Sequence, residues 1–100
     1  MSHEHFKGFV RFLKSHYPKK RVSVRRVPVQ DDRFGDCDRL KDGSFRIRIG
    51  KHLDEGGALH MLIHEWAHVL SWRDKGPDHG LRWVKAYRDV YELYEQWIQE

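Results

Sequence analysis

The sequence has very little cysteine and no long apolar run. Cys37 is the single cysteine among 100 residues, so neither an intrachain disulfide nor a Cys-rich zinc ribbon can form within it. No apolar stretch approaches the roughly 18 residues that a membrane-spanning helix needs. The apolar segment of a signal peptide does not follow Met1 either. These features favour a protein of the reducing cytoplasm, with Cys37 as a small buried hydrophobic residue.

The sequence also lacks internal repeats, low-complexity segments and any stretch with the composition of a linker. Residues 1–100 are therefore expected to form one small domain. A chain of this size buries only a modest core and has little stability to spare. A bound metal would therefore contribute noticeably to its folding.

Charge of one sign dominates only the first half of the chain. Residues 1–50 hold 13 Lys and Arg against 6 Asp and Glu, whereas residues 51–100 hold 6 against 9. The basic N-terminal half either binds a polyanion such as nucleic acid or forms an ordinary solvated surface. The charge alone does not separate these two interpretations.

Residues 1–50 are predicted to form one helix and three strands. The helix covers residues 3–17, where apolar side chains follow the helical period as far as Pro18. Alternating apolar side chains predict strands over residues 21–29 and 45–49, and residues 35–40 are expected to form a short strand before the hairpin signal Asp42-Gly43. We expect a small, mostly antiparallel three-stranded sheet with one apolar face and one basic face.

The basic face carries four arginines and has more than one interpretation. Arg46 and Arg48 alternate with apolar residues in the third strand, and Arg25 and Arg26 lie in the first. They form either an exposed sheet surface or a surface for nucleic acid or an acidic substrate. The apolar residues alternate at Val22 and Val24 and again at Val27 and Val29, but the two runs are out of phase at Arg25-Arg26, which predicts a bulge there. If strand 45–49 lies at the rim of a cleft, it could pair with an extended peptide.

Residues 51–100 are predicted to form two helices. Asp54 is a plausible N-cap of the first, which runs to about Arg73 because Gly76-Pro77 prevents its continuation. The second opens at His79-Gly80 and continues to about Gln99, with one apolar side. The predicted fold class is therefore α+β, with an N-terminal helix, a small sheet and then two helices.

The first of these two helices contains the motif His64-Glu65-Trp66-Ala67-His68. Residues four apart lie on the same helix face, so His64 and His68 can present two imidazole nitrogens to one ion. Glu65 falls about 100° further round the helix, where it can hold a water on that ion without ligating it. An apolar stripe occupies the opposite side. The motif has the arrangement that metal-assisted hydrolysis needs, two neutral nitrogen ligands beside a carboxylate base.

A catalytic zinc site usually has three protein ligands and a water, so a third ligand is required. The candidates are Asp74, Asp78, His79 and the carboxylates of the last helix. His79 is placed best, because it opens the next helix after a break that suits a turn back toward His68. Asp78 is the second candidate, and it can instead cap the helix or accept a hydrogen bond from an imidazole. We expect His60 to lie beside the site rather than on the metal.

Two motifs, His64-Glu65-Trp66-Ala67-His68 and His79-Gly80-Leu81-Arg82-Trp83, resemble those of the SprT-like zinc metallopeptidases of the minigluzincin type. In that family HExxH lies on one helix, and a third histidine opens the next helix in a His-Gly-x-x-aromatic motif. The order of elements is similar over essentially the whole chain. The interval from His68 to His79 is shorter than in the best-known members, and the C-terminal zinc ribbon of many members is missing.

The resemblance implies a zinc metallopeptidase that acts on a protein or peptide substrate. It implies that His64, His68 and His79 bind Zn²⁺. Glu65 would then take a proton from a zinc-bound water and pass it to the leaving amine.

Three points stay open from the sequence. His60 and Tyr87 are both candidates for stabilising an oxyanion. The protein could also be a non-catalytic zinc-containing module that binds nucleic acid or another protein through the basic sheet face. An enzyme acting on a non-peptide amide would use the same zinc chemistry.

Overall fold

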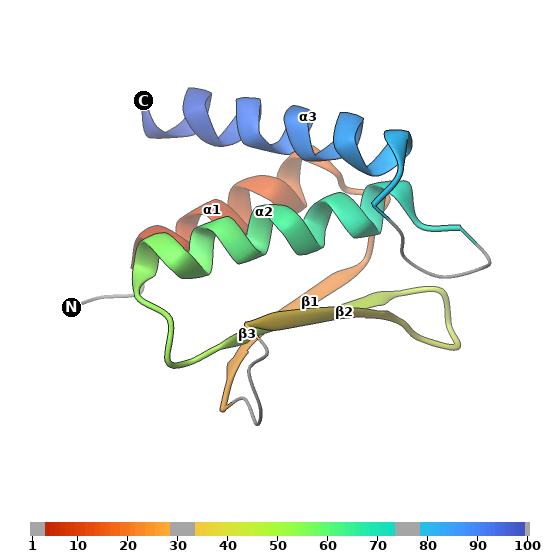
Figure 1. The fold of residues 1–100 in the computed structure, drawn as a ribbon, viewed down its shortest axis with the longest axis horizontal. Coiled ribbons are helices and arrows are strands. Elements are labelled where there is room, and N and C mark those ends of the chain that lie inside the picture. Colours follow the sequence, from red (N-terminus) through yellow and green to blue (C-terminus); the bar gives the residue numbers. More distant parts are fainter. Residues whose placement is uncertain (1–3, 29–33, 74–78, 100) are drawn as a thin grey trace.

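The chain folds into one helix, a three-stranded sheet and two further helices (Figure 1). The computed structural model describes residues 4–28, 34–73 and 79–99. The elements are α1 (Glu4–His16), β1 (Val22–Val27), β2 (Gly35–Arg39), β3 (Phe45–Gly50), α2 (Glu55–Ser71) and α3 (Leu81–Ile98). The predicted α+β class and order of elements are confirmed. Within the described residues, no helix is both long and apolar enough to cross a membrane.

β3 lies in the centre of the sheet, between β1 and β2. β2 and β3 are antiparallel and are joined by a tight turn, in which Gly43 adopts a φ of 86° that favours glycine. β1 and β3 are parallel, so antiparallel pairing is confined to the hairpin. Because β3 is paired along both edges, the suggestion that strand 45–49 could pair with an extended peptide is wrong.

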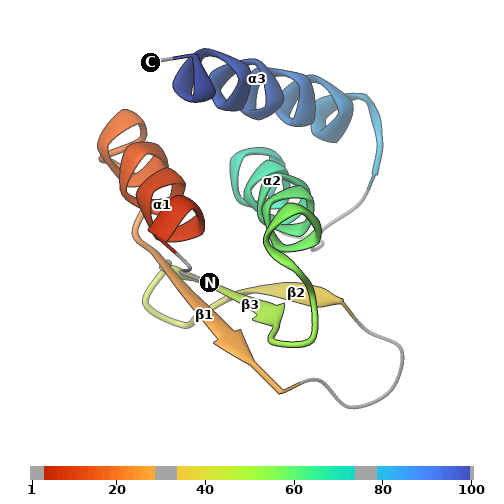
Figure 2. The same ribbon diagram turned by 90° about the vertical axis from the view of Figure 1, so that its left-hand side faces the viewer.

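The helices all cover the same face of the sheet (Figure 2). α1 and α2 lie next to the sheet, and α3 lies across their outer side. The apolar side chains of β3 and α2 meet between these layers, where Ile47, Leu62 and Trp66 are fully buried. This burial fixes the rotation of α2 about its own axis, and so decides which of its side chains remain free to form a site.

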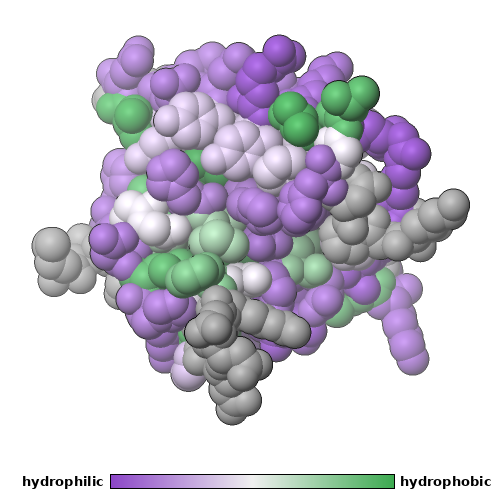
Figure 3. Space-filling view, viewed as in Figure 1, coloured by the Kyte–Doolittle hydropathy of each residue, from purple (hydrophilic) through white to green (hydrophobic). Residues whose placement is uncertain are grey.

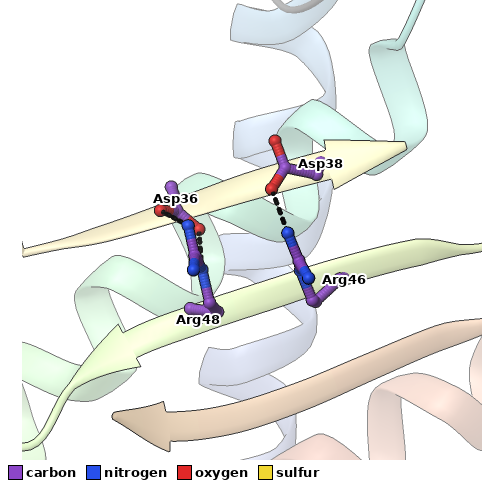
Figure 4. A network of polar contacts seen from close by, with 4 residues as sticks. All are labelled: Asp36, Asp38, Arg46 and Arg48. Carbon is purple, nitrogen blue, oxygen red and sulfur yellow. Dashed lines mark hydrogen bonds and ion pairs between the residues drawn. The ribbon is translucent and has the colours of Figure 1, made fainter. Parts of the chain in front are cut away.

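The opposite face of the sheet carries two arginine–aspartate pairs (Figure 4). The Arg48 guanidinium donates hydrogen bonds to both carboxylate oxygens of Asp36, at 2.8 and 2.6 Å. Arg46 donates to Asp38 at 2.8 Å. Such exposed pairs contribute little to stability, but they connect directly opposed residues of β2 and β3. Two of the four arginines assigned to a basic face are therefore balanced by neighbouring acids.

Arg26 lies on the side of β1 that faces the helices. Its guanidinium donates to the carbonyl oxygens of Gly50 and Leu53 at 3.1 and 2.7 Å, and lies 5.3 Å from the centre of the Phe6 ring. The pairing of β1 with β3 continues without interruption from Val22 to Val27. The predicted bulge at Arg25-Arg26 is therefore wrong. Arg26 occupies a position of β1 that would suit an apolar residue, and the strand stays regular because backbone carbonyls accept hydrogen bonds from its guanidinium.

Replacing the fully buried Leu62 with alanine is expected to lower the free energy of unfolding by about 2–5 kcal/mol, because it leaves a cavity in the core. Leu81→Ala is the matched control, since Leu81 is 89% exposed and should change stability by less than about 0.5 kcal/mol. Urea denaturation measures both values. Similar losses in the two variants would contradict the packing described here.

Candidate metal centre

α2 holds two histidines at a fixed separation on one side. The helix begins after Asp54, whose carboxylate accepts a hydrogen bond from the Gly57 N–H at 2.7 Å, which confirms the predicted N-cap. His64 and His68 are one turn apart, and their ring centres are 5.0 Å apart. His68 is buried and His64 is partly buried, so both imidazoles lie at the boundary between the core and solvent.

His79, just before α3, completes a group of three convergent imidazoles. Its Nε2 atom lies 3.1 Å from Nε2 of His68 and 3.3 Å from Nε2 of His64. Nitrogens bound to a tetrahedral zinc at about 2.0–2.1 Å are separated by about 3.3–3.4 Å, so the observed spacing fits one ion. Among the residues that the structure describes, these three histidines form the one group close enough to hold a metal.

Hydrogen bonding between the imidazoles explains their close approach less well than a shared metal ion does. A neutral imidazole donates through one nitrogen only, so Nε2 of His79 can donate to one of its two neighbours at most. A metal cation accepts the lone pairs of all three nitrogens at once. Burial and the proximity of His79 lower the pKa of His64, which favours the neutral form that binds metals. The chemistry of the donor set therefore fits a divalent metal such as zinc.

Trp83 connects the two helices beside the imidazoles. Its indole N–H donates to the backbone carbonyl of His64 at 3.2 Å. The centre of its ring lies 5.0 Å from that of His64, 5.6 Å from that of His68 and 4.7 Å from that of His79. Trp83 is therefore a positioning residue of the site. In the sequence, Trp83 stands out only as the last residue of the motif His79-Gly80-Leu81-Arg82-Trp83, although its place one turn after His79 indicated this role.

Glu65 is buried next to His64, with 5% of its surface exposed. Burial, and secondarily the negative charge of Asp36, raise the pKa of Glu65 to about 7. Burial raises the pKa of Cys37 to about 12, and Glu65 is the largest electrostatic contributor to that shift. Because Asp36 and Cys37 both belong to β2, the Glu65 carboxyl lies on the side of α2 that faces this strand. Cys37 is buried, as predicted.

The remaining predicted site residues lie outside the group of three histidines. His60 is exposed one turn before His64 and is not part of the group, as expected. Tyr87 packs against Trp83 in a tilted arrangement with ring centres 5.2 Å apart, one turn further along α3. The oxyanion roles suggested for His60 and Tyr87 stay predictions. Asp74 and Asp78 lie outside the described residues.

Comparison of the chain with models of protein families, with curated proteins and with solved structures found no match. The interpretation of the site consequently depends on its own geometry.

The purified protein is expected to bind one zinc ion per chain. His79→Ala should weaken binding by roughly 100-fold or more, because it removes one of three nitrogen donors. His60→Ala is the matched control and should bind zinc like the wild type. Elemental analysis and competition with a chromogenic chelator measure stoichiometry and affinity. Unchanged affinity in His79→Ala, or an equal loss in both variants, would exclude the assigned ligand set.

The raised pKa of Glu65 predicts a pH dependence of stability in chelator-treated protein. The folded state holds the Glu65 proton more tightly than the unfolded state, whose carboxyl titrates near 4.5. The resulting stabilisation is complete below that pH and is lost as the pH rises to about 7. Glu65→Gln should lack this loss, which is of the order of 3 kcal/mol.

His64 acts in the opposite sense, since its lowered pKa makes stability rise with pH below about 6.5. The difference between wild type and Glu65→Gln in urea unfolding at a series of pH values isolates the contribution of Glu65. Parallel stability curves for the two proteins would contradict the burial of this carboxyl.

Proposed function

We propose that the protein is a zinc-dependent metallopeptidase of SprT-like type. The observation that carries the proposal is the combination of three convergent imidazole nitrogens with a buried carboxyl, Glu65, whose pKa lies close to 7. A structural zinc site is normally closed by four protein ligands, whereas the described residues offer three here. With three ligands from the described residues, a fourth position would be left for a water or a substrate. The single cysteine of the sequence supports a reducing compartment, which we take to be the cytoplasm.

The side chains can be given distinct roles in hydrolysis of a peptide bond. Zinc held by His64, His68 and His79 would lower the pKa of a coordinated water toward about 7 and polarise the substrate carbonyl. Glu65 would accept the proton of the attacking water as the new C–O bond forms. It would then give that proton to the amine nitrogen as the C–N bond breaks. A carboxyl with a pKa near the working pH performs both transfers efficiently.

The outer edge of β2, on the side away from β3, is the place proposed for an extended substrate. β2 is hydrogen-bonded to β3 along one edge and forms the outer strand of the described sheet. Glu65 lies between α2 and this strand, since Asp36 and Cys37 are its electrostatic neighbours. A peptide that added to the outer edge of β2 would run past Glu65 through main-chain hydrogen bonds. Such binding would be tolerant of side chains, as expected of so small an enzyme.

The alternative of a non-catalytic module that binds nucleic acid through a basic sheet face has less support. Arg46 and Arg48 are paired with aspartates, and Arg26 faces the helices. A non-catalytic site also has no use for a buried carboxyl next to a ligand, because burying it costs free energy.

Glu65→Gln tests the proposal most simply. The variant should keep its zinc and lose at least about 1,000-fold in the rate of cleavage of labelled, unfolded casein, because the proton-transfer group is removed. Glu95→Gln, an exposed change of the same kind on α3, should retain full activity. Zinc content is measured on the same samples. If the zinc-loaded wild type cleaves neither casein nor a peptide library, or if Glu65→Gln remains active, the proposal fails.

A further inference from the structure

A second concave surface lies between α1 and β1 and shares no residue with the histidine site. It encloses a cavity of about 540 Å³, a volume typical of ligand-binding sites. It is lined by Phe6, Lys7, Val10, Arg11, Val24, Arg26 and Lys51. This surface is termed the α1–β1 groove below.

The α1–β1 groove has an apolar floor and a cationic rim. Phe6, Val10 and Val24 provide the floor, and Phe6 is almost completely buried. Lys7, Arg11 and Lys51 are exposed around it. None of these three rim cations forms an ion pair with a residue in the described part of the chain. Like charges gathered around an apolar cavity are complementary to a ligand that combines apolar groups with negative charge.

β1 is an edge strand of the described sheet, and its backbone at Val24 lies beside the groove. The carbonyls of Arg21 and Val27 accept hydrogen bonds from Phe45 and Lys51, on the side of β3. Hydrogen bonding alternates along a parallel strand, so the N–H and C=O groups of Val24 point to the outer edge. The side chain of Val24 meanwhile lines the cavity. A row of such backbone groups is a template for another strand.

We propose that the α1–β1 groove binds an extended acidic segment of a partner protein, which adds to β1 as a fourth strand. Its backbone pairs with the outer edge at Val24, and an apolar side chain enters the cavity. Flanking carboxylates lie beside Lys7 and Arg11. This occupant uses the free strand edge, the apolar floor and the rim charges together.

Two other occupants satisfy fewer of these features. A second copy of the chain would bring Arg25 and Arg26 of its own β1 against the same rim, and like charges oppose such pairing. A small amphipathic anion would use the floor and the cations but would leave the backbone of β1 unpaired. The proposal goes beyond the proposed peptidase, because binding here requires neither zinc nor Glu65.

The experiment begins with selection of peptides from a random, phage-displayed library of eight-residue sequences on the folded full-length protein. The enriched peptides should alternate apolar and acidic residues. Synthetic versions should bind in fluorescence anisotropy about tenfold more weakly to Lys7→Glu or Arg11→Glu, and more weakly at high salt, because the rim charge is reversed. Lys85→Glu, the same change on exposed α3, is the matched control and should bind like the wild type.

Hydrogen exchange separates strand addition from the other occupants. The amide of Val24 should exchange more slowly when the peptide is bound, whereas that of Cys37 in β2 should not change. Far-UV circular dichroism verifies that each variant is folded. The proposal is overturned if no acidic peptide is enriched, if Lys7→Glu and Lys85→Glu bind equally, or if bound peptide leaves exchange at Val24 unchanged. Concentration-dependent dimers that protect Val24 without peptide would overturn it in favour of self-pairing.

Discussion

The packing of α3 against α2 determines whether three histidines can share one ion. The helical repeat fixes His64 and His68 relative to each other, but His79 comes from a separate segment. The ring of Trp83 on α3 packs beside both His64 and His68 of α2, with ring centres 5.0 and 5.6 Å apart. The hydrogen bond from Trp83 to the backbone of His64 joins the helices at the same level. A bound metal would link the two helices further, so metal binding and folding should support each other.

The burial of Glu65 lowers the stability of the folded protein at this site. A carboxyl with 5% exposure and a pKa near 7 is held where an apolar residue would stabilise the protein more. Asp36 adds to this shift, while Arg48 binds the Asp36 carboxylate through two hydrogen bonds. The ion pairs of the outer sheet face therefore act on the electrostatics of the site as well as on strand register.

On the face that Figure 3 shows, apolar side chains lie in small separate groups among polar ones.

Local sequence features predicted most of the elements and the three histidines that the structure brings together. The HExxH spacing placed His64 and His68 on one helix face, and the Gly76-Pro77 break indicated that His79 lies close to the beginning of the next helix, which the structure starts at Leu81. Strand order was beyond such reasoning, because the central place of β3 depends on pairings between distant segments. The match of Asp36 and Asp38 with Arg48 and Arg46 was present in the sequence, yet it becomes visible only once the hairpin register is known. The burial of Glu65 likewise depends on the approach of β2 to α2.

The coordination of the zinc ion in the purified protein tests the central claim most directly. X-ray absorption at the zinc edge distinguishes imidazole nitrogens from sulfur and from non-imidazole oxygen ligands. The account predicts three imidazole nitrogens at about 2.0–2.1 Å and one further light ligand from solvent. The same spectrum recorded with a small hydroxamate inhibitor should show the solvent ligand replaced. Two results would contradict an open, catalytic site formed by His64, His68 and His79. One is a spectrum of four protein ligands that does not change when the inhibitor is added, and the other is a spectrum with fewer than three imidazoles.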